Sequence, residues 1–451
     1  MSVATTLKAQ LQGSVEDDPD VLAAYASDQT ALATHGTPVA LVRAKHADDV
    51  VATLRFAYRH QIPVVTRGAG TGLAGSANAV DGAIVLSVAA LNRILTIDTV
   101  SRLAVVEPGV INGALAAAVK RQGLYYAPDP ASREISTIGG NIATNAGGAC
   151  CLKYGVTGDH VLALKAVLPD GTQIVTGSKS RKDVAGLDLK RLLVGSEGTL
   201  AVIVEATLRL RSLPPPPATL VAFFPTLDTA ARAIVAMENA ADLSLLEMMD
   251  RVTIQAVEAL TALGLDTHAA AMVLVQSDAA NAAAVIQSCE AIANQHAATE
   301  VYWTADPDEG RQFLTARSAA LPALEKMGTT LLDDVAVPKS RLVDMFARCE
   351  AAASRHQVVI GTFGHAGDGN LHPTIVFDPA DQQSRHRAYA AFDEIVKAAV
   401  EFGGSISGEH GVGNLKLGYL SHMIGDPERE LMRRIKTCFD PTGILNPGKA
   451  Y

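Results

Sequence analysis

Two glycine-rich segments in the first third of the chain constrain its fold most strongly. The first, TRGAGTGLAGS from Thr66 to Ser76, follows a short β-rich run and places four glycines within eight residues. Such a backbone adopts conformations that other residues avoid, and its consecutive NH groups can face phosphate oxygens. It is not a loop of the Gly-Lys-Ser/Thr type, because no such triplet follows. Taken alone, the segment is equally consistent with a tight turn.

The second segment, PDPASREISTIGGNIATNAGG, runs from Pro128 to Gly148 and adds four more glycines with two asparagines among them. Two such loops in one domain offer many backbone donors and little side-chain bulk, which suits an extended dinucleotide lying close to the main chain. A third piece, GSEGTL from Gly195 to Leu200, precedes a predicted strand. We therefore expect a dinucleotide-binding domain.

Hydrophobic periodicity predicts an α+β organisation up to residue 213. Short β-rich runs alternate with segments of helical period, and the expected strands are Val39–Arg43, Val64–Thr66, Ile84–Leu86 and Leu103–Val106. A helix is expected after His46, ending at Gln61 before Pro63. Four consecutive prolines from Pro214 to Pro217 favour a stiff connector, which marks a domain boundary.

Beyond the prolines a β-α-β order repeats. Strands are expected at Leu220–Phe224, Leu243–Met249 and Ala271–Val275, with a helix from about Thr226, so a second sheet with helices on one face should follow. The turn-rich ending DPTGILNPGK should return to the first domain. With 451 residues the chain needs two or three domains. We place them at 1–213, 214–425 and 426–451, the last being the returning segment.

Composition excludes several classes of function. Hydrophobic residues make up 48% and charged residues 19%, as in a globular protein. A net charge of −9 opposes broad attraction to nucleic acid or anionic lipid, so a small-molecule partner is expected. The first residues lack a signal-peptide pattern and no apolar stretch is long enough to span a bilayer. Five cysteines without C-x-x-C spacing indicate a reducing cytoplasm, where any membrane association would be peripheral, at the inner face.

The sharpest chemical signal is GTFGHAGDGNLHP, in which His365 and His372 flank a Gly-Asp-Gly turn. If the chain reverses across Gly367–Asn370, antiparallel pairing sets His365 opposite His372, so both imidazoles emerge on one face. Downstream, SGEHGVG adds Glu409 in a glycine-flanked loop. Two histidines and a carboxylate suit a catalytic divalent ion with open coordination positions. The alternative interpretation is a set of structural histidines.

His410 follows Glu409 directly and need not be a ligand. Pointing elsewhere, it would serve as the base that removes a hydroxyl proton, a role that histidine fills well near neutral pH. A structural hydrogen bond within the loop is the alternative interpretation of His410.

The order of these motifs, over nearly the whole chain, resembles the vanillyl-alcohol oxidase/p-cresol methylhydroxylase superfamily of FAD-linked oxidases. The resemblance is strongest to the branch of D-lactate dehydrogenase, the glycolate oxidase D-subunit and D-2-hydroxyglutarate dehydrogenase. It implies a two-part FAD-binding domain, a second α+β, ferredoxin-like substrate or cap domain that carries the metal site, and a C-terminal return. Relatives with covalent flavin often attach it to a histidine in the first loop, which has none here, so noncovalent FAD is implied. Ala201 stands where relatives commonly have glycine.

The resemblance also assigns residues. Those implied for FAD binding are Arg67, Gly68, Ala69, Gly70, Thr71, Gly72, Pro128, Asp129, Ser132, Gly139, Gly140, Asn141, Asn145, Gly148, Glu197, Gly198 and Asn446. His365, His372 and Glu409 match metal ligands, for zinc or manganese, and His410 matches the catalytic base. Arg317 matches an arginine that binds the substrate carboxylate, which a guanidinium grips through two bonds. By sequence alone Arg317 is a helix-surface residue.

One departure bears on the substrate. Relatives that use 2-hydroxyglutarate tend to have a lysine near the position of Leu332, and an apolar side chain there fits a methyl or alkyl tail. The resemblance thus implies a dehydrogenase that oxidises D-lactate or a longer D-2-hydroxy monoacid to a 2-keto acid, with hydride passing to flavin N5. Leu332 argues against a D-2-hydroxyglutarate dehydrogenase, which stays an alternative.

Partners and rival functions follow from the same features. Electrons must leave through a quinone, a cytochrome, an electron-transfer flavoprotein or an iron–sulfur subunit, because the cysteines match no cluster-binding pattern. A homodimer is consistent with the sequence. One alternative is the FAD subunit of a glycolate oxidase complex. Another is a noncatalytic nucleotide-binding or metal-storage protein that uses the same loops and histidines only for binding.

Overall fold

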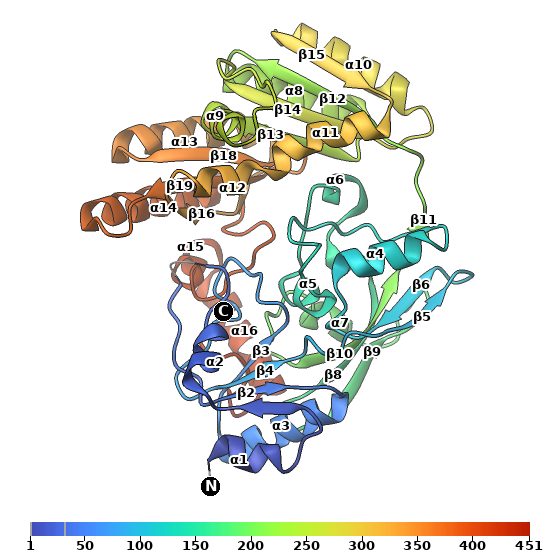
Figure 1. Cartoon of the computed structure of the whole chain (residues 1–451), viewed down its shortest axis with the longest axis vertical. Coiled ribbons are helices and arrows are strands. Elements are labelled where there is room, and N and C mark those ends of the chain that lie inside the picture. The colour runs from blue at the N-terminus through green and yellow to red at the C-terminus, as the bar shows by residue number, and fades with distance from the viewer. Residues whose placement is uncertain (1, 31–32) are drawn as a thin grey trace. The chain divides into compact units, whose positions relative to one another are not determined.

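The computed structural model describes residues 2–30 and 33–451 of the chain (Figure 1). The chain forms two compact units: the first comprises Met1–Gly147, Gly155–Leu213 and Glu409–Tyr451, and the second comprises Gly148–Tyr154 and Pro214–Gly408. The units divide at Leu213 and Pro214, within the predicted connector. The return to the first unit begins at Glu409, earlier than residue 426, and a short segment before Gly155 belongs to the second unit.

The first unit begins with a four-stranded sheet of order β1-β2-β4-β3, in which β2 and β3 both pair parallel to β4. The elements are α1 (Val3–Lys8), β1 (Ser14–Glu16), α2 (Pro19–Ala24), β2 (Ala40–Arg43), α3 (Ala47–His60), β3 (Val64–Arg67) and β4 (Ile84–Ser87). Helix α3 buries Val50, Leu54 and Ala57, which recur at helical spacing, and it ends at Gln61 in a left-handed conformation. The predicted helix and three of the predicted strands are therefore confirmed.

A five-stranded antiparallel sheet of order β5-β6-β10-β8-β9 forms the other part of the first unit. Its strands are β5 (Ile94–Asp98), β6 (Leu103–Val106), β8 (Val161–Val167), β9 (Gln173–Gly177) and β10 (Val202–Arg209). The accompanying elements are α4 (Asn112–Lys120), β7 (Leu124–Tyr125), α5 (Ile138–Thr144), η1 (Thr157–His160), α7 (Leu189–Leu193) and β11 (Arg211–Ser212). Leu115, Ile138 and Leu208 are fully buried in its core.

The C-terminal segment supplies η3 (Leu417–Tyr419), α15 (Leu420–Met423) and α16 (Asp426–Phe439). After α16 the chain lies beside β3, because the Val64 NH donates to the Ile444 carbonyl at 2.8 Å and the Asn446 NH donates to the Val64 carbonyl at 2.8 Å. The ending therefore contacts the strand that leads into the first glycine loop, as a returning segment should.

The second unit is built on an eight-stranded sheet of order β15-β12-β14-β13-β18-β19-β16, with β17 also paired to β19. The strands are β12 (Ala218–Phe224), β13 (Leu245–Asp250), β14 (Ala271–Ser277), β15 (Glu300–Thr304), β16 (Thr329–Leu332), β17 (Val335–Ala336), β18 (Val359–His365) and β19 (Asn370–Phe377). The helices are α6 (Cys151–Tyr154), α8 (Leu227–Ala240), α9 (Arg251–Thr261), α10 (Ala282–Gln295), α11 (Pro307–Ser318), α12 (Ala320–Glu325), η2 (Lys339–Arg341), α13 (Leu342–His356) and α14 (Gln382–Glu401).

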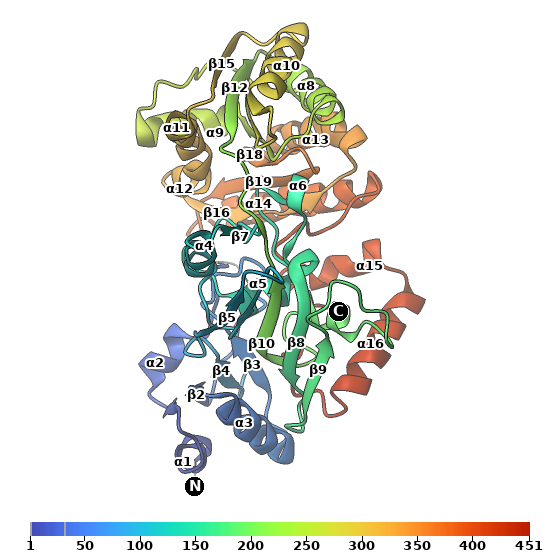
Figure 2. The same ribbon diagram turned by 90° about the vertical axis from the view of Figure 1, so that its right-hand side faces the viewer.

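Helices cover both faces of this sheet, so the prediction of helices on one face was wrong. Figure 2 shows α8, α10 and α13 on one side of the strands and α9, α11 and α12 on the other. The reason lies in the central strands, where every residue of β12 and of β14 is buried. An apolar strand without alternation needs cover on both sides. No helix in the described residues is long and apolar enough to cross a membrane.

Candidate active site

The two glycine loops of the first unit lie against each other. A Cβ atom added to Gly68 would lie 2.3 Å from Oγ1 of Thr137, so the first loop requires glycine at this point of close approach. In the described residues, none of the amide NH groups from residue 68 to residue 72 donates to a protein acceptor. A run of amide donors in a glycine-rich turn suits a pyrophosphate.

Buried polar atoms in the same loops also fit a dinucleotide. Oγ1 of Thr66, Oγ of Ser136 and Nδ2 of Asn141 are buried and have no hydrogen-bond partner within the described parts of the chain. Buried polar atoms are rarely left unpaired, so a bound group that supplies both donors and acceptors is expected here. FAD is such a group, and the residues present fit it.

Residues of the GSEGTL motif and of the C-terminal segment contact the end of the first glycine loop. The buried Glu197 accepts hydrogen bonds from Oγ of Ser76 at 2.5 Å and from the NH of Val412 at 2.7 Å. Asn446 donates through Nδ2 to the carbonyls of Ser76 at 2.9 Å and Glu197 at 2.6 Å. Burial raises the pKa of Glu197. Glu197 and Asn446 thus support the end of the first loop.

Lys449 was not among the predicted site residues. Its ammonium group donates to Oδ1 of Asn446 at 3.0 Å and to the Asn78 carbonyl, and burial lowers its pKa to about 8. The motif NPGK had been predicted only to return to the first domain. A lysine in so polar a turn gave no sign that it would be buried.

Some of the predicted FAD residues engage protein groups. Arg67 donates to the Ser27 carbonyl at 2.8 Å, and Asn145 ends α5 in a left-handed conformation while its Oδ1 accepts from the Gly158 NH at 2.8 Å. Gly148 belongs to the second unit rather than to the loop of the first. The FAD contacts of the whole predicted set stay a prediction.

In the second unit, His365 and His372 lie on the hairpin formed by β18 and β19. The register pairs His365 with Asn370 and Phe363 with His372, so the expected pairing of His365 with His372 was wrong. The turn closes one residue earlier, at Gly369, whose φ is +83° and whose missing Cβ would lie 2.1 Å from the Val337 carbonyl oxygen. The observed register differs from the expected one by two residues on the partner strand. Side chains two residues apart on a strand point to the same face, so His365 and His372 still share one face of the hairpin. The imidazole centroids lie 5.3 Å apart with perpendicular rings.

Glu247 on β13 connects two of the predicted residues, and sequence reasoning missed it. Its buried carboxylate accepts from Nδ1 of His365 at 2.6 Å and from Nε of Arg317 at 2.7 Å. Burial opposes the charge of Glu247, but the charges of His365 and Arg317 outweigh it and lower its pKa. The available signal was a single acidic residue inside the apolar strand Leu243–Met249.

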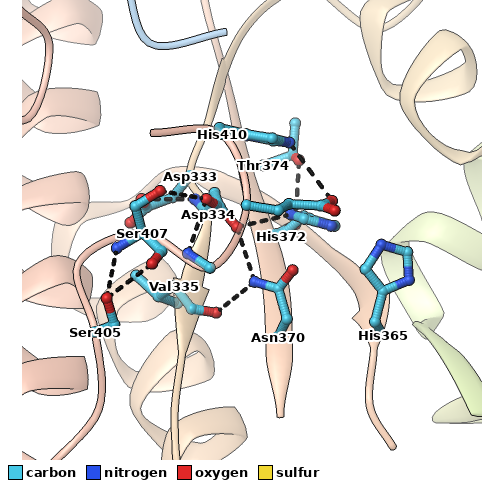
Figure 3. A network of polar contacts seen from close by, with 12 residues as sticks. Asp333, Asp334, Val335, His365, Asn370, His372, Thr374, Ser405, Ser407 and His410 are labelled. Atoms are coloured by element: carbon cyan, nitrogen blue, oxygen red, sulfur yellow. Dashed lines mark hydrogen bonds and ion pairs between the residues drawn. The ribbon is translucent and has the colours of Figure 1, made fainter. Parts of the chain in front are cut away.

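Asp334 plays a similar part beside His372 and was also missed. It accepts from Nδ2 of Asn370 at 2.8 Å and from Oγ of Ser407 at 2.7 Å, and its Oδ1 lies 3.8 Å from Nδ1 of His372. Figure 3 shows Asp334 with Asn370, Ser407 and His372 around it. Of the two imidazoles, that of His365 therefore has a carboxylate hydrogen-bonded at Nδ1, which leaves its Nε2 as the ligand atom in the way that metal-binding histidines are usually held.

Glu409 and His410 follow Gly408, whose NH donates to Oδ2 of Asp334 at 2.9 Å. Glu409 and His410 begin the C-terminal part of the first unit, whereas His365 and His372 belong to the second, so the ligand set His365, His372 and Glu409 stays a prediction. Nε2 of His410 lies 3.8 Å from Oε1 of Glu409. Imidazole and carboxylate donors fit zinc or manganese, so the chemistry of this set suits a divalent ion.

Two family models match the chain, and both concern FAD. A model described as "FAD binding domain" matches residues 38–177, and one described as "FAD linked oxidases, C-terminal domain" matches residues 213–450. A glycolate oxidase subunit, GlcD, of Bacillus subtilis is 40% identical over 92% of this chain and 89% of its own length. A D-lactate dehydrogenase of Archaeoglobus fulgidus is 37% identical over 91% of this chain and 90% of its own length.

Solved structures extend the comparison to the fold. p-Cresol methylhydroxylase with bound substrate aligns with a TM-score of 0.81 at 16% identity, covering 99% of this chain and 96% of that one. A 4-ethylphenol oxidase of Gulosibacter chungangensis aligns with a TM-score of 0.78 at 17% identity, covering 99% and 96%. The predicted α+β fold of the p-cresol methylhydroxylase type is confirmed. The chain belongs to the FAD-linked oxidases, and its fold is that of p-cresol methylhydroxylase.

Proposed function

We propose that this protein is an FAD- and divalent-metal-dependent dehydrogenase that oxidises D-2-hydroxy monoacids to 2-keto acids. The observation that carries this function is a group of polar side chains in the second unit. Glu247 accepts hydrogen bonds from both Arg317 and His365, and the imidazole of His372 lies next to that of His365. A carboxylate-binding arginine next to imidazole ligands suits a substrate that carries a carboxylate and a neighbouring hydroxyl. Relatives named glycolate oxidase subunit and D-lactate dehydrogenase act on such compounds.

Arg317 binds the substrate carboxylate in this mechanism. Its Nε donates to Glu247 at 2.7 Å, and its guanidinium lies 4.7 Å from the centroid of the Phe363 ring. The terminal nitrogens have no protein partner among the described residues, so they can grip a carboxylate through two parallel hydrogen bonds. The ion pair with Glu247 fixes the orientation of the Arg317 guanidinium group before substrate binds.

His410 takes the proton of the substrate hydroxyl. Glu409, whose Oε1 lies 3.8 Å from Nε2 of His410, stabilises the positive charge that the ring then gains. His365, His372 and Glu409 would hold the metal, which would supply polarisation of the hydroxyl oxygen. The loops of the first unit would hold FAD, which would supply the hydride acceptor.

Leu332 favours a monoacid as substrate. It pairs with Thr374 on β19, two residues from His372, so its side chain shares the face of the predicted ligands. It packs against the apolar cluster that contains Phe363. An apolar group at this position suits a methyl or alkyl tail and leaves a second carboxylate unpaired.

A second candidate function is the FAD subunit of a glycolate oxidase complex. The 40% identity to the GlcD subunit of Bacillus subtilis favours it. Such a subunit would need partner subunits for turnover, whereas a D-lactate dehydrogenase would pass electrons from its flavin to a quinone, a cytochrome or an electron-transfer flavoprotein.

Anaerobic flavin reduction tests both candidates. The purified FAD-loaded chain is mixed with D-lactate, D-2-hydroxybutyrate, glycolate or D-2-hydroxyglutarate, and bleaching of the flavin absorbance is followed. We expect the two longer monoacids to bleach fastest, and we expect His410→Gln to slow bleaching by roughly 100-fold or more, as loss of a general base does. Leu332→Lys should shift the preference towards D-2-hydroxyglutarate.

Three outcomes would contradict this function. Faster bleaching by glycolate than by D-lactate would favour the glycolate oxidase subunit. Full activity of His410→Gln with every acid would remove the proposed base. No bleaching of bound flavin by any acid would favour a protein that only binds nucleotide and metal.

A further inference from the structure

We infer that Glu197 is a positioning residue for the proposed base, because its carboxylate holds the loop after His410 against the FAD-binding loops. This inference rests on the proposed function for the role of His410. The contacts that carry it lie entirely within the first unit, to which Glu197, His410 and both glycine loops belong up to Gly147. Sequence comparison had implied only that Glu197 contacts FAD.

The side chain of Glu197 joins two segments that lie far apart in the sequence. Its Oε1 accepts from the Val412 NH at 2.7 Å, and its Oε2 accepts from the Gly413 NH at 2.8 Å. The same Oε2 accepts from Oγ of Ser76, at the end of the first glycine loop, at 2.5 Å. One buried carboxylate therefore holds the end of this loop and the two amides that closely follow His410.

The backbone of Glu197 is itself held from both sides. Its NH donates to the Ala143 carbonyl in α5 at 2.8 Å, and its carbonyl accepts from Nδ2 of Asn446 at 2.6 Å. Its φ is +52°, in the left-handed region that favours glycine. A residue with a side chain in that region is strained, and such strain is typical of positions where the side chain has a specific task.

Close packing fixes the loop after His410 from two directions. A Cβ added to Gly411 would lie 2.8 Å from Oε1 of Glu197. One added to Gly413 would lie 1.9 Å from the carbonyl oxygen of Ala74, in the first glycine loop. Both positions therefore require glycine, and the loop has little freedom to move away from the Glu197 carboxylate.

The residue before His410 approaches the second glycine segment. A Cβ added to Gly147 would lie 2.5 Å from Oε2 of Glu409. The chain on either side of His410 is thus packed against the segments that are predicted to bind FAD. Among these contacts, the carboxylate of Glu197 supplies hydrogen bonds to the backbone amides after His410. We therefore expect Glu197 to set the position of His410 relative to the flavin.

Hydrogen exchange of the full-length protein, with and without FAD, tests the contact directly. We expect the amides of Val412 and Gly413 to be protected in the wild type, and to exchange more slowly when FAD is bound. Glu197→Gln replaces one accepting oxygen by an NH2 group, which cannot accept from an amide. One of the two amides should then exchange roughly tenfold faster, as expected for one lost hydrogen bond.

Anaerobic flavin reduction by D-lactate, at saturating divalent metal, tests the consequence for the base. In Glu197→Gln the limiting rate should fall by roughly 10–100-fold, because a displacement of about 1 Å costs a catalytic group that much. The apparent Kd for D-lactate should stay within about twofold of the wild-type value, since Arg317, the proposed carboxylate-binding residue, is unchanged. A general loss of structure would not separate rate from affinity in this way.

Asp49→Asn is the matched control. Asp49 is a buried carboxylate of the same unit that accepts from the backbone NH of Gln12 at 2.7 Å and of Lys45 at 2.9 Å, and it belongs to none of the predicted sites. We expect wild-type exchange at Val412 and Gly413 and wild-type flavin reduction in this variant.

Three results would overturn the inference. They are wild-type amides at Val412 and Gly413 that exchange like those of an unstructured chain, wild-type reduction rates in Glu197→Gln, and equal slowing in Asp49→Asn. The wild-type exchange measurement decides the question if Glu197→Gln fails to fold. Wild-type flavin that no acid reduces would contradict the proposed function instead, and the exchange measurement would still decide whether Glu197 holds the loop.

Discussion

Glu247 holds two side chains of the proposed mechanism with one buried carboxylate, since His365 and Arg317 both donate to it. Glu247→Gln keeps the shape and removes the charge. We expect metal affinity to fall by about 10–100-fold, as it does when a carboxylate behind a metal-binding histidine is lost. We also expect a higher KM for D-lactate, because Arg317 loses its anchor.

Metal affinity is measured by competition with a chromophoric chelator, and KM by flavin reduction. Glu325→Gln, at the exposed end of α12, is the control. Unchanged metal affinity in Glu247→Gln would show that Glu247 does not act through His365.

Asp250 should make the second unit pH-sensitive. It caps α9 by accepting from the Thr253 NH at 2.8 Å, also accepts from the Thr362 NH at 2.8 Å, and burial raises its pKa to about 6. The folded state therefore keeps a proton between about pH 4 and pH 6 that the unfolded state has released. Stability falls as the pH rises through this window, by up to about 3 kcal/mol, since each tenfold difference in proton affinity is about 1.4 kcal/mol.

Asp250→Asn should remove this contribution. Urea unfolding at pH 4.5 and at pH 7 is compared for the two proteins, and the expected difference lies in the slope with pH rather than in the absolute stability. Asp306→Asn is the control, because Asp306 caps α11 in the same way but is exposed. Parallel pH profiles for wild type and Asp250→Asn would contradict the expectation.

At the scale of single residues, the sequence predicted the candidate metal-binding histidines but not the carboxylate that holds one of them in place. His365 and His372 were visible because they flank a short turn. Glu247 lies 118 residues before His365, and inside an apolar strand its side chain gave no sign of a distant partner. Contacts between side chains far apart in the chain depend on the sheet order, which a single sequence does not reveal.

At the scale of elements, the contact between the two glycine loops is testable. Gly68→Ala would bring a methyl group against Oγ1 of Thr137, which caps α5 by accepting from the Gly140 NH at 3.3 Å. Overpacking at such a point costs about 1–3 kcal/mol. We expect FAD to bind about 10–100-fold more weakly, measured by fluorescence as flavin is titrated into apoprotein.

Removing the clash should restore part of the affinity, so the double variant Gly68→Ala, Thr137→Ala is predicted to bind FAD more tightly than Gly68→Ala alone. Gly418→Ala is the control, because no atom lies within 4 Å of its added Cβ. If Gly68→Ala binds FAD like wild type, the two loops are not held together by this contact.

The hairpin shows why register was harder to predict than the elements themselves. The expected turn was Gly367–Asn370, yet Asn370 begins β19 because its side chain donates to Asp334 and to the Val335 carbonyl. Those partners come from a neighbouring strand region rather than from the hairpin. The shared face of the two histidines was predicted correctly, since alternation survives a shift of two residues.

At the scale of the whole molecule, local sequence patterns predicted the order of the domains. They did not predict that a short segment inside the first domain belongs to the second unit. Residues 148–154 follow the second glycine loop and belong to the second unit. Lys153 donates there to Asp242 at 2.9 Å and to Asp278 at 2.8 Å, and Tyr154 donates to Asp278 as well. These acidic partners lie about 90 and 125 residues away in the chain, so periodicity could not reveal them.

Different side chains are predicted to hold the metal and the flavin. Nearly all predicted FAD residues and the predicted metal ligand Glu409 belong to the first unit, whereas His365 and His372 belong to the second. We therefore expect a chelator to leave the flavin bound while it abolishes reduction by D-lactate. The measurement is protein-bound flavin absorbance after gel filtration, followed by anaerobic mixing with D-lactate. Zinc or manganese should restore bleaching, and reduction by dithionite should be unaffected throughout.

Two histidine variants sharpen this test. His372→Ala should bind FAD and yet fail to regain bleaching with added metal, because a ligand is missing. His268→Gln, an exposed histidine outside the site, should behave like wild type. Loss of flavin together with metal would show that the two sites are not independent, and bleaching that is indifferent to chelator would exclude a metal from the reaction.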